Sequence, residues 1–376
     1  MAPPNTDIIQ EIEKLNLQNL ARTKGNYVVY PNDKYPELEL FDHQDPGHRG
    51  DPAKASLYKN AEKIFDLTPH IGTEIHGLQL STLNDTQKDD LALLVAERGV
   101  VFFRDQDIDV YQAREWARHF GPLHVHNTFG HPPGLPEVHV VYFDTETVKK
   151  YKSIGGVNLQ GAARSAADGW HSDVTYDNQP AGLTLLKAST IDTLPHTGGD
   201  TLWSSSYAAY DRLSPAFQKF VEGLEAVHSG QQQVDEAINA NHVVRRKNWT
   251  SIHPVVRTHP VTGWKALFVQ PGFTRSIVGL SKRESDIVLQ YLFDHISGGV
   301  DFQVRFKWEE NSVAVWDNRV TNHNAVFDYL EFGKRHGWRV TPQGEKPYFD
   351  PKSKSKRQDL AEKAEAEAKE NAAKQN

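Results

Sequence analysis

Trp170-His171-Ser172-Asp173-Val174-Thr175 is the stretch on which the interpretation of fold and chemistry depends. If it forms a strand, successive side chains point to opposite faces, so His171 and Asp173 project from the same side. An imidazole and a carboxylate placed in this way are two of the three ligands of a facial triad, which suits non-haem Fe(II) and leaves coordination positions open. In a chain with 18 histidines, however, His-x-Asp fits a partly buried polar pair equally well. The metal interpretation therefore needs a third ligand and a site for an anion.

The composition predicts a globular protein and excludes several functions. The chain has 376 residues, of which 38% are apolar and 24% charged, and its net charge is −7. This balance gives no electrostatic reason to bind nucleic acid or an anionic membrane surface. No apolar run approaches the roughly 20 residues that span a bilayer, and the first residues lack the pattern of a signal peptide. Because the chain has no cysteine, disulfides and thiolate ligands are excluded, and we expect a cytoplasmic protein whose metal chemistry uses histidine and carboxylate.

Three parts of the chain differ in character. Residues 1–60 are polar, and we interpret them as an N-terminal arm draped over the core or a neighbouring subunit, with a short helix at 7–15. Residues 61–350 form the main domain. Residues 351–376 contain a single large apolar residue, so they cannot bury a face and should be a solvated or disordered extension. Within the main domain, 145–169 have no stable periodicity, and both a mobile lid over the site and a passive insertion stay open.

The hydrophobic patterns predict a β-rich fold with helices. Helical spacing is found at 85–97, 109–120, 206–223 and 281–295. Short strand patterns bounded by turn residues are found at 99–104, 138–143, 181–187, 198–203, 255–257, 267–269, 304–306 and 313–316. Many short strands with helices among them favour a mainly β fold with α elements, a double-stranded β-helix or jelly roll decorated by helices.

The third ligand and the anion site are predicted near the end of the main domain. The stretch 316–325 contains His323, and its sequence separation is no obstacle because sheet partners in a jelly roll are often distant in the chain. If the next segment is a strand, Arg335, Gly337 and Arg339 share one face, with the arginines about 13 Å apart. Guanidinium groups suit bidentate recognition of a carboxylate or sulfonate. Two surface arginines in weak ion pairs are the alternative, but Gly337 between them would leave space for a ligand.

Several stretches, in order along the chain, carry a resemblance. They are Phe102-Phe103-Arg104-Asp105-Gln106, Gly121-Pro122-Leu123-His124-Val125-His126, Trp170-His171-Ser172-Asp173-Val174-Thr175, Thr197-Gly198-Gly199-Asp200-Thr201, Trp316-Asp317-Asn318-Arg319-Val320-Thr321-Asn322-His323 and Arg335-x-x-x-Arg339. Together they resemble the taurine dioxygenase family, whose members depend on Fe(II) and 2-oxoglutarate. The resemblance covers roughly residues 64–349, and the arm is similar to that of eukaryotic sulfonate dioxygenases.

The resemblance implies a role for each matching residue. The Fe(II) ligands would be His171, Asp173 and His323. The residues holding the distal carboxylate of 2-oxoglutarate would be Thr201 and Arg335. The sulfonate of a small anionic substrate would be received by His126, Arg339 and the backbone N–H of Val174, and its pocket would include Phe129 and Phe273.

The resemblance also implies a reaction. Hydroxylation of the carbon next to sulfur would release sulfite and an aldehyde, while 2-oxoglutarate and O2 give succinate and CO2. At the positions where the taurine enzyme contacts the substrate amine this chain has Phe129 and Ala167, so we expect taurine to be a poor substrate. Alkyl sulfate esters and aryloxyalkanoates stay open as alternative substrates for the same chemistry. A non-catalytic metal-binding jelly roll and a zinc hydrolase stay open as alternative classes of protein. Because family members often form dimers or tetramers, a homo-oligomer is expected.

Overall fold

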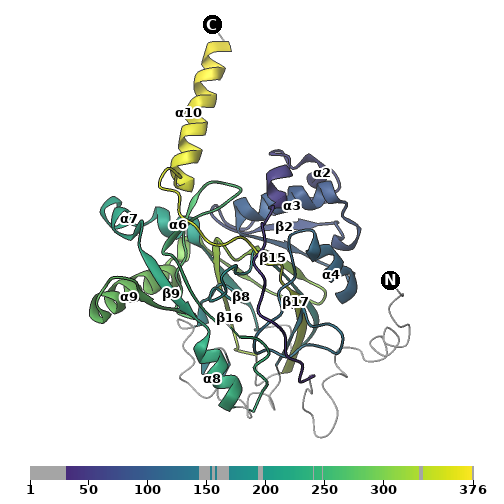
Figure 1. Ribbon diagram of the computed structural model, residues 1–376. Coiled ribbons are helices and arrows are strands. Elements are labelled where there is room, and N and C mark those ends of the chain that lie inside the picture. The colour runs from purple at the N-terminus through teal and green to yellow at the C-terminus, as the bar shows by residue number, and fades with distance from the viewer. Residues whose placement is uncertain are drawn as a thin grey trace.

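The computed structural model describes residues 31–143, 153–154, 157–158, 169–193, 198–239, 241–247, 249–329 and 333–374 (Figure 1). The strands are β1 (Lys63–Asp66), β2 (Thr73–His76), β3 (Val100–Phe103), β4 (Val138–Phe143), β5 (Ser153–Ile154), β6 (Val157–Asn158), β7 (Leu183–Thr193), β8 (Thr201–Ser205), β9 (Glu225–Ser229), β10 (Thr250–Pro254), β11 (Val256–Thr258), β12 (Lys265–Leu267), β13 (Thr274–Ile277), β14 (Gln303–Phe306), β15 (Val313–Asp317), β16 (Thr321–Ala325) and β17 (Gly333–Val340). The α-helices are α2 (Ala55–Tyr58), α3 (Asp85–Arg98), α4 (Val110–Arg118), α6 (Ser206–Asp211), α7 (Pro215–Val221), α8 (Gln231–Asn239), α9 (Lys282–Gly298) and α10 (Lys356–Lys374). Short 3-10 helices are η1 (Pro46–Arg49), η2 (Leu80–Thr82) and η5 (Val300–Phe302).

The largest sheet is the wall on which the site is built. Its strand order is β1-β2-β3-β15-β7-β17-β4, and its pairs are antiparallel except for β2 with β3. All of β3 is buried. Val101 and Phe103 pack in a core that includes residues of α3 and α4, whereas Val100 and Phe102 pack in a core shared with β8 and β14. A strand covered on both faces has the continuous apolar sequence seen here.

A second sheet, with the order β14-β8-β16, faces the first across a core rich in aromatic rings. Phe102 stacks on Phe306 with ring centroids 4.0 Å apart, and Trp203 packs edge-on to Phe102 at 5.2 Å. An isolated antiparallel bridge joins His171 to His323 of β16 and so extends this sheet by one more segment. Two facing sheets surrounded by helices are the predicted jelly-roll architecture, and that prediction is confirmed.

Within the described residues the predicted helices are found, with one correction. Helices α3, α4 and α9 begin at capping boxes formed by Asn84, Asp109 and Ser281. The single helix predicted over 206–223 is wrong, because this segment contains the two short helices α6 and α7. Ser214 caps the second of them, and Pro215, which has no N–H, is tolerated only in a first helical turn.

The described part of the arm lies against the core. The Tyr35 N–H donates to the Arg245 carbonyl at 2.7 Å, and the Gln179 side-chain amide pairs with both backbone groups of Phe41 at 2.9 Å. The helix predicted at 7–15 lies outside the described residues. So does most of the predicted lid at 145–169, where the structure describes the β5–β6 pair and residue 169.

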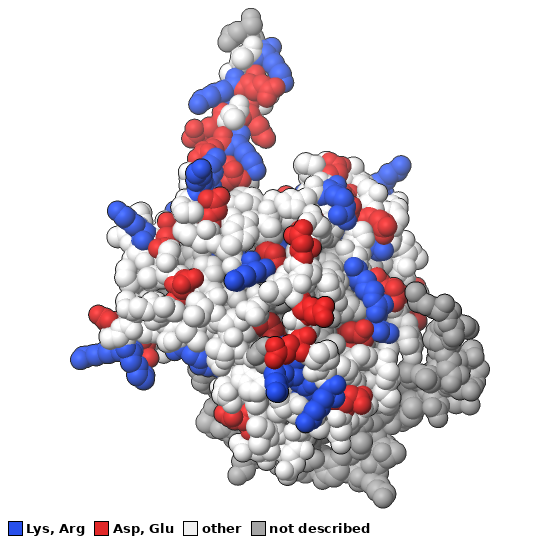
Figure 2. All heavy atoms as spheres, in the orientation of Figure 1, with Lys and Arg blue, Asp and Glu red and all other residues white. Residues whose placement is uncertain are grey.

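The C-terminal segment, for which a solvated or disordered extension was expected, forms helix α10. It is helical, none of its residues is buried, and it projects away from the body of the protein (Figure 1). Side chains of both charge signs alternate along it in Figure 2, and Lys363 pairs with Asp359 at 2.8 Å one helical turn away. Such i,i+4 pairs support the exposed part of the helix, while its first turn is tied to the body of the protein by a hydrogen bond from the Trp264 indole N–H to Asp359 at 2.8 Å. Among the described helices, none combines the length and the apolar character needed to cross a membrane.

A buried histidine in β10 predicts a specific loss of stability in acid. The His253 Nε2 lies 2.9 Å from the Asp177 carbonyl, and burial, the largest effect, lowers the pKa of His253 to about 4. Because the unfolded chain binds this proton near pH 6.5, the unfolded state holds more protons between pH 6.5 and 4, and stability falls with pH through that window by about 1.4 kcal/mol per pH unit.

The variant His253→Gln isolates this contribution, because its amide can donate to the same carbonyl but does not titrate. Urea unfolding of both proteins at pH 7, 6 and 5 should show that the free energy of unfolding declines less steeply with falling pH in the variant. The two slopes should differ by up to about 1.4 kcal/mol per pH unit, the contribution of one proton. Identical slopes would contradict the prediction.

Candidate active site

Metal-ligating side chains converge between the two sheets. His171 and His323 are fixed opposite each other, because the His171 N–H donates to the His323 carbonyl at 2.9 Å and the reverse bond is 2.7 Å long. Asp173 Oδ1 lies 3.9 Å from Nε2 of each histidine, and one ligand atom from each residue lies within 4.8 Å of the others. Neither Nε2 has a hydrogen bond to a described residue. This arrangement is a 2-His-1-carboxylate set open to a metal ion.

The stretch that carries two of these ligands is not the strand that we predicted. Only His171 makes a β-bridge, and 173–176 form a turn in which Val174 adopts a φ of +47°. A left-handed conformation is uncommon for a β-branched residue and persists only where its surroundings hold it. Here the Asp173 N–H donates to Asn318 Oδ1 at 3.2 Å. The turn, rather than strand alternation, therefore brings the imidazole and the carboxylate together.

Burial and charge set the protonation states that a metal needs. Burial lowers the pKa of His171 and places the pKa of His323 well below its ordinary value, so both imidazoles are neutral at pH 7. Burial acts to raise the pKa of Asp173, but the charge of Arg339, the largest opposing effect, holds that pKa below its usual range. Neutral imidazoles and an ionised carboxylate are the forms that bind a divalent cation. The residues present therefore fit Fe(II).

A pocket opens beside the carboxylate of the triad. The residues that line it include His126, Phe129, His139, Asp173, Val174 and Arg339. Four of the residues predicted to contact the substrate are thus brought together. The backbone N–H of Val174 donates no hydrogen bond to a described residue, so a buried donor is left free at the pocket wall.

The fifth predicted substrate contact, Phe273, is not among the residues that line this pocket. It is buried, packs edge-on to Tyr176 with ring centroids 4.9 Å apart, and lies 6.2 Å from the His171 ring. It therefore packs beside a metal-ligand candidate and beside the turn. Ala167, the other position expected to shape the substrate site, lies outside the described residues.

Arg339 joins the metal ligands to the pocket. Its Nη1 donates to Asp173 Oδ1 at 2.8 Å, the same oxygen that lies 3.9 Å from each of the two histidines. Its Nε donates to His139 Nδ1 at 3.0 Å. One guanidinium thus contacts both the carboxylate of the triad and the wall of the pocket.

Arg335 lies at the other end of the same strand and is buried, with 9% of its surface exposed. Its guanidinium donates to the Gly199 carbonyl and lies over the ring of Trp308, 5.0 Å from the centroid. The Trp308 indole N–H donates to Thr201 Oγ1 at 2.9 Å. Trp308, which was not predicted, therefore joins the two residues assigned to the distal carboxylate of 2-oxoglutarate.

Gly337 is required for a reason other than the one we predicted. A Cβ at this position would lie 2.6 Å from the Lys187 carbonyl oxygen of the neighbouring strand β7. The register between β17 and β7 also shifts between His336 and Gly337. The glycine therefore permits close approach of two strands at an irregularity and does not make space for a ligand.

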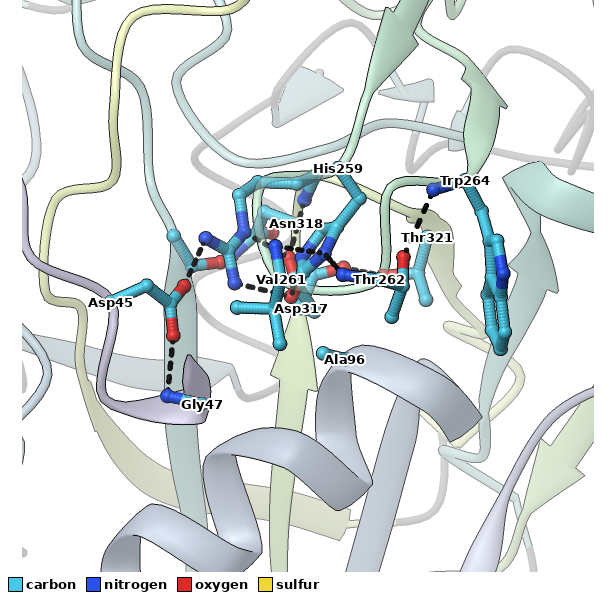
Figure 3. Close-up of polar contacts among 12 residues, drawn as sticks. Asp45, Gly47, Ala96, His259, Val261, Thr262, Trp264, Asp317, Asn318 and Thr321 are labelled. Atoms are coloured by element: carbon cyan, nitrogen blue, oxygen red, sulfur yellow. Dashed lines mark hydrogen bonds and ion pairs between the residues drawn. The ribbon is translucent and has the colours of Figure 1, made fainter. Parts of the chain in front are cut away.

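A buried charge network holds the loop that supports the triad (Figure 3). Arg319 donates to both carboxylate oxygens of Asp317 at 2.8 and 2.7 Å and to Asp45 of the arm at 2.5 Å. His259 Nε2 lies 3.0 Å from Asp317 on the other side. Asn318, which lies between Asp317 and Arg319 in the chain, accepts a hydrogen bond from the backbone N–H of Asp173. The arm is thereby connected to the site through one guanidinium.

Replacing this guanidinium should cost far more stability than replacing an exposed one. Arg319→Met leaves buried carboxylates without their partner, so the free energy of unfolding should fall by about 3–5 kcal/mol. In the control Arg212→Met, the lost pair with Asp301 has partners 38% and 55% exposed, and the change should stay below about 1 kcal/mol. Urea unfolding measures both, and equal losses would show that the network is not the anchor described.

Two facing sheets, a 2-His-1-carboxylate triad and a pocket with a guanidinium define the class of jelly-roll non-haem iron oxygenases. The profile of the taurine catabolism dioxygenase TauD, TfdA family matches residues 63–341, and the chain belongs to that family. It is 44% identical over 337 residues to the alpha-ketoglutarate-dependent dioxygenase cnsP of Penicillium expansum, covering 88% of this chain and 89% of that protein.

It is also 38% identical over 350 residues to the alpha-ketoglutarate-dependent sulfonate dioxygenase of Saccharomyces cerevisiae, covering 90% of this chain and 82% of that protein. The crystal structure of a taurine dioxygenase from Burkholderia xenovorans is 33% identical with a TM-score of 0.63, covering 77% of this chain and 92% of that one. The chain is therefore an Fe(II)- and 2-oxoglutarate-dependent dioxygenase.

Sequence reasoning missed residues that act through others. Asn318 stands inside a quoted motif, but nothing in the sequence indicates that its amide holds a backbone N–H 145 positions away. Trp308 had no signal of its own. For His139 the sequence did carry a signal, because strand alternation over 138–143 places it on a defined face. Its partner across the sheet, Arg339, could not be known from the sequence.

Proposed function

We propose that the protein hydroxylates the carbon next to sulfur in an organosulfonate. The product would collapse to an aldehyde and sulfite, while 2-oxoglutarate and O2 are converted to succinate and CO2. The observation that carries the proposal is a single pocket in which Arg339 and the free Val174 N–H lie beside Asp173 of the triad. An anion held there would present its neighbouring carbon to the metal.

In this proposal His171, Asp173 and His323 hold Fe(II), and Thr201 and Arg335 hold the distal carboxylate of 2-oxoglutarate. The buried position of Arg335 supports its assignment, because a guanidinium with little water around it binds a carboxylate strongly. The metal and the keto acid together would supply the oxidising chemistry. The side chains would bind, orient and exclude water.

His126, Arg339 and the Val174 N–H would receive the sulfonate, and Phe129 would give the pocket an apolar wall. Glu137 also lines the pocket, but its carboxylate is paired with Arg114 at 2.9 Å. Among the described residues that line the pocket, the side-chain partners that an ammonium group needs are therefore taken or apolar. We expect taurine to be turned over less efficiently than an alkylsulfonate without an amine.

A substrate panel tests the proposal and separates its rivals. Protein with Fe(II), 2-oxoglutarate and O2 is given hexanesulfonate, taurine, hexyl sulfate or phenoxyacetate, and succinate, sulfite, sulfate and phenol are measured. Sulfite from hexanesulfonate, with a higher kcat/KM than for taurine, is the expected result. Sulfate or phenol as the main product would show that the substrate is a sulfate ester or an aryloxyalkanoate. If none of the four compounds supported succinate formation, the proposed function would be contradicted. The cytoplasmic location and the homo-oligomer stay predictions from the sequence.

A further inference from the structure

His139 lies directly opposite Arg339 in the pairing of β4 with β17, at the pocket wall. The Arg339 Nε donates to its Nδ1 at 3.0 Å. The imidazole stacks on Phe129, with centroids 4.3 Å apart and planes 26° apart, and lies 5.5 Å from the His126 ring. The ring is therefore held in one orientation by a hydrogen bond at one edge and an aromatic face on one side.

These contacts fix the tautomer of the ring. Because a guanidinium Nε always carries its proton, Nδ1 of His139 must accept, and the neutral imidazole carries its own proton on Nε2. This Nε2–H has no hydrogen bond to a described residue. The same assignment of the tautomer applies to His126, whose Nδ1 accepts the backbone N–H groups of Thr128 and Phe129, both at 3.1 Å, while its Nε2 lies 3.5 Å from the Tyr176 hydroxyl. Two neutral rings in one pocket thus carry their protons on Nε2.

We propose that His139 is a specificity-determining residue that donates its Nε2–H to the anionic head of the substrate. With Arg339 and His126 it lines the pocket and adds a third side-chain donor. A sulfonate directs its three terminal oxygens along separate tetrahedral directions and can meet donors that do not share a plane, whereas the lone pairs of a carboxylate lie in one plane, so a donor outside that plane is not matched. The inference rests on the proposed function, because it refines the class of anion that the same pocket selects.

Two substitutions separate donation to the substrate from support of Arg339. His139→Asn places an amide oxygen near the Nδ1 position, so it can still accept from Arg339 but loses the donor. His139→Gln places an amide N–H near the Nε2 position and restores the donor. The measurement is calorimetric binding of hexanesulfonate and of heptanoate, without O2, to protein loaded with Fe(II) and 2-oxoglutarate. Unchanged circular dichroism and an unchanged affinity for 2-oxoglutarate serve as checks on the fold.

His139→Asn should weaken hexanesulfonate binding by about 10- to 100-fold, the range for a hydrogen bond to a charged group, and heptanoate binding by less than about 3-fold. His139→Gln should recover most of the hexanesulfonate affinity. Equal losses for both ligands would show that the ring acts only through Arg339, and no loss would show that it makes no contact; either result overturns the inference. If the wild type releases sulfite in either case, the proposed function survives, whereas wild-type protein that binds no sulfonate contradicts both.

Discussion

Removing one ligand of the triad will end turnover without unfolding the protein. His171→Ala should lower kcat for succinate formation by more than about 100-fold, the upper range for loss of a residue that only supports a metal ligand. The side chain of His171 is 31% exposed, so its loss leaves no sealed cavity in the core. Succinate formation and metal content after equilibration with Fe(II) are the two measurements.

A matched histidine controls for general effects of the substitution. His76 in β2 has a side chain 37% exposed and pairs with Glu74 at 3.0 Å. His76→Ala should keep full metal content and activity within about 2-fold, because surface substitutions away from a site change little. If His171→Ala retained wild-type turnover, the assignment of the triad would be wrong.

The second large effect is that the two arginines of β17 should each affect the binding of a different ligand. Arg335→Met should raise the KM for 2-oxoglutarate and leave the dissociation constant of hexanesulfonate nearly unchanged. Arg339→Met should weaken hexanesulfonate and leave 2-oxoglutarate nearly unchanged. Truncating one partner of a buried charge pair costs about 2–5 kcal/mol, which corresponds to roughly 30- to 4000-fold in each affected constant.

Each arginine variant is the control for the other, since both remove one guanidinium from the same strand face. Arg335 contacts Gly199 and Trp308, whereas Arg339 contacts Asp173 and His139. These separate environments are the physical reason to expect separate effects. Variants that both weaken the same ligand would show that the two groups serve one anion site.

Much of the fold could be predicted because it depends on local patterns. The apolar run at β3 and the helical spacing at 85–97, 109–120 and 281–295 predicted these elements close to the observed bounds. The split between α6 and α7 was missed although Pro215 marks it, because the apolar spacing continues across the break.

The site divides in the same way. His171, Asp173 and His323 could be proposed as ligands from residue type and order. Their geometry could not, because it depends on a left-handed Val174 and on a bond from the distant Asn318. The same holds for other tertiary contacts. The role of His139 depends on its hydrogen bond with Arg339 across the sheet, and the need for Gly337 depends on the nearby carbonyl of the next strand.

The most direct test of the central claim is an anaerobic optical titration of the Fe(II)-loaded protein with 2-oxoglutarate. If His171, Asp173 and His323 hold Fe(II) and leave room for the keto acid, a visible charge-transfer absorption should grow, saturate at one 2-oxoglutarate per chain, and shift when hexanesulfonate is added. The absorption should be lost in His171→Ala. Wild-type protein that binds Fe(II) but develops no absorption, or His171→Ala that develops it unchanged, would contradict the account.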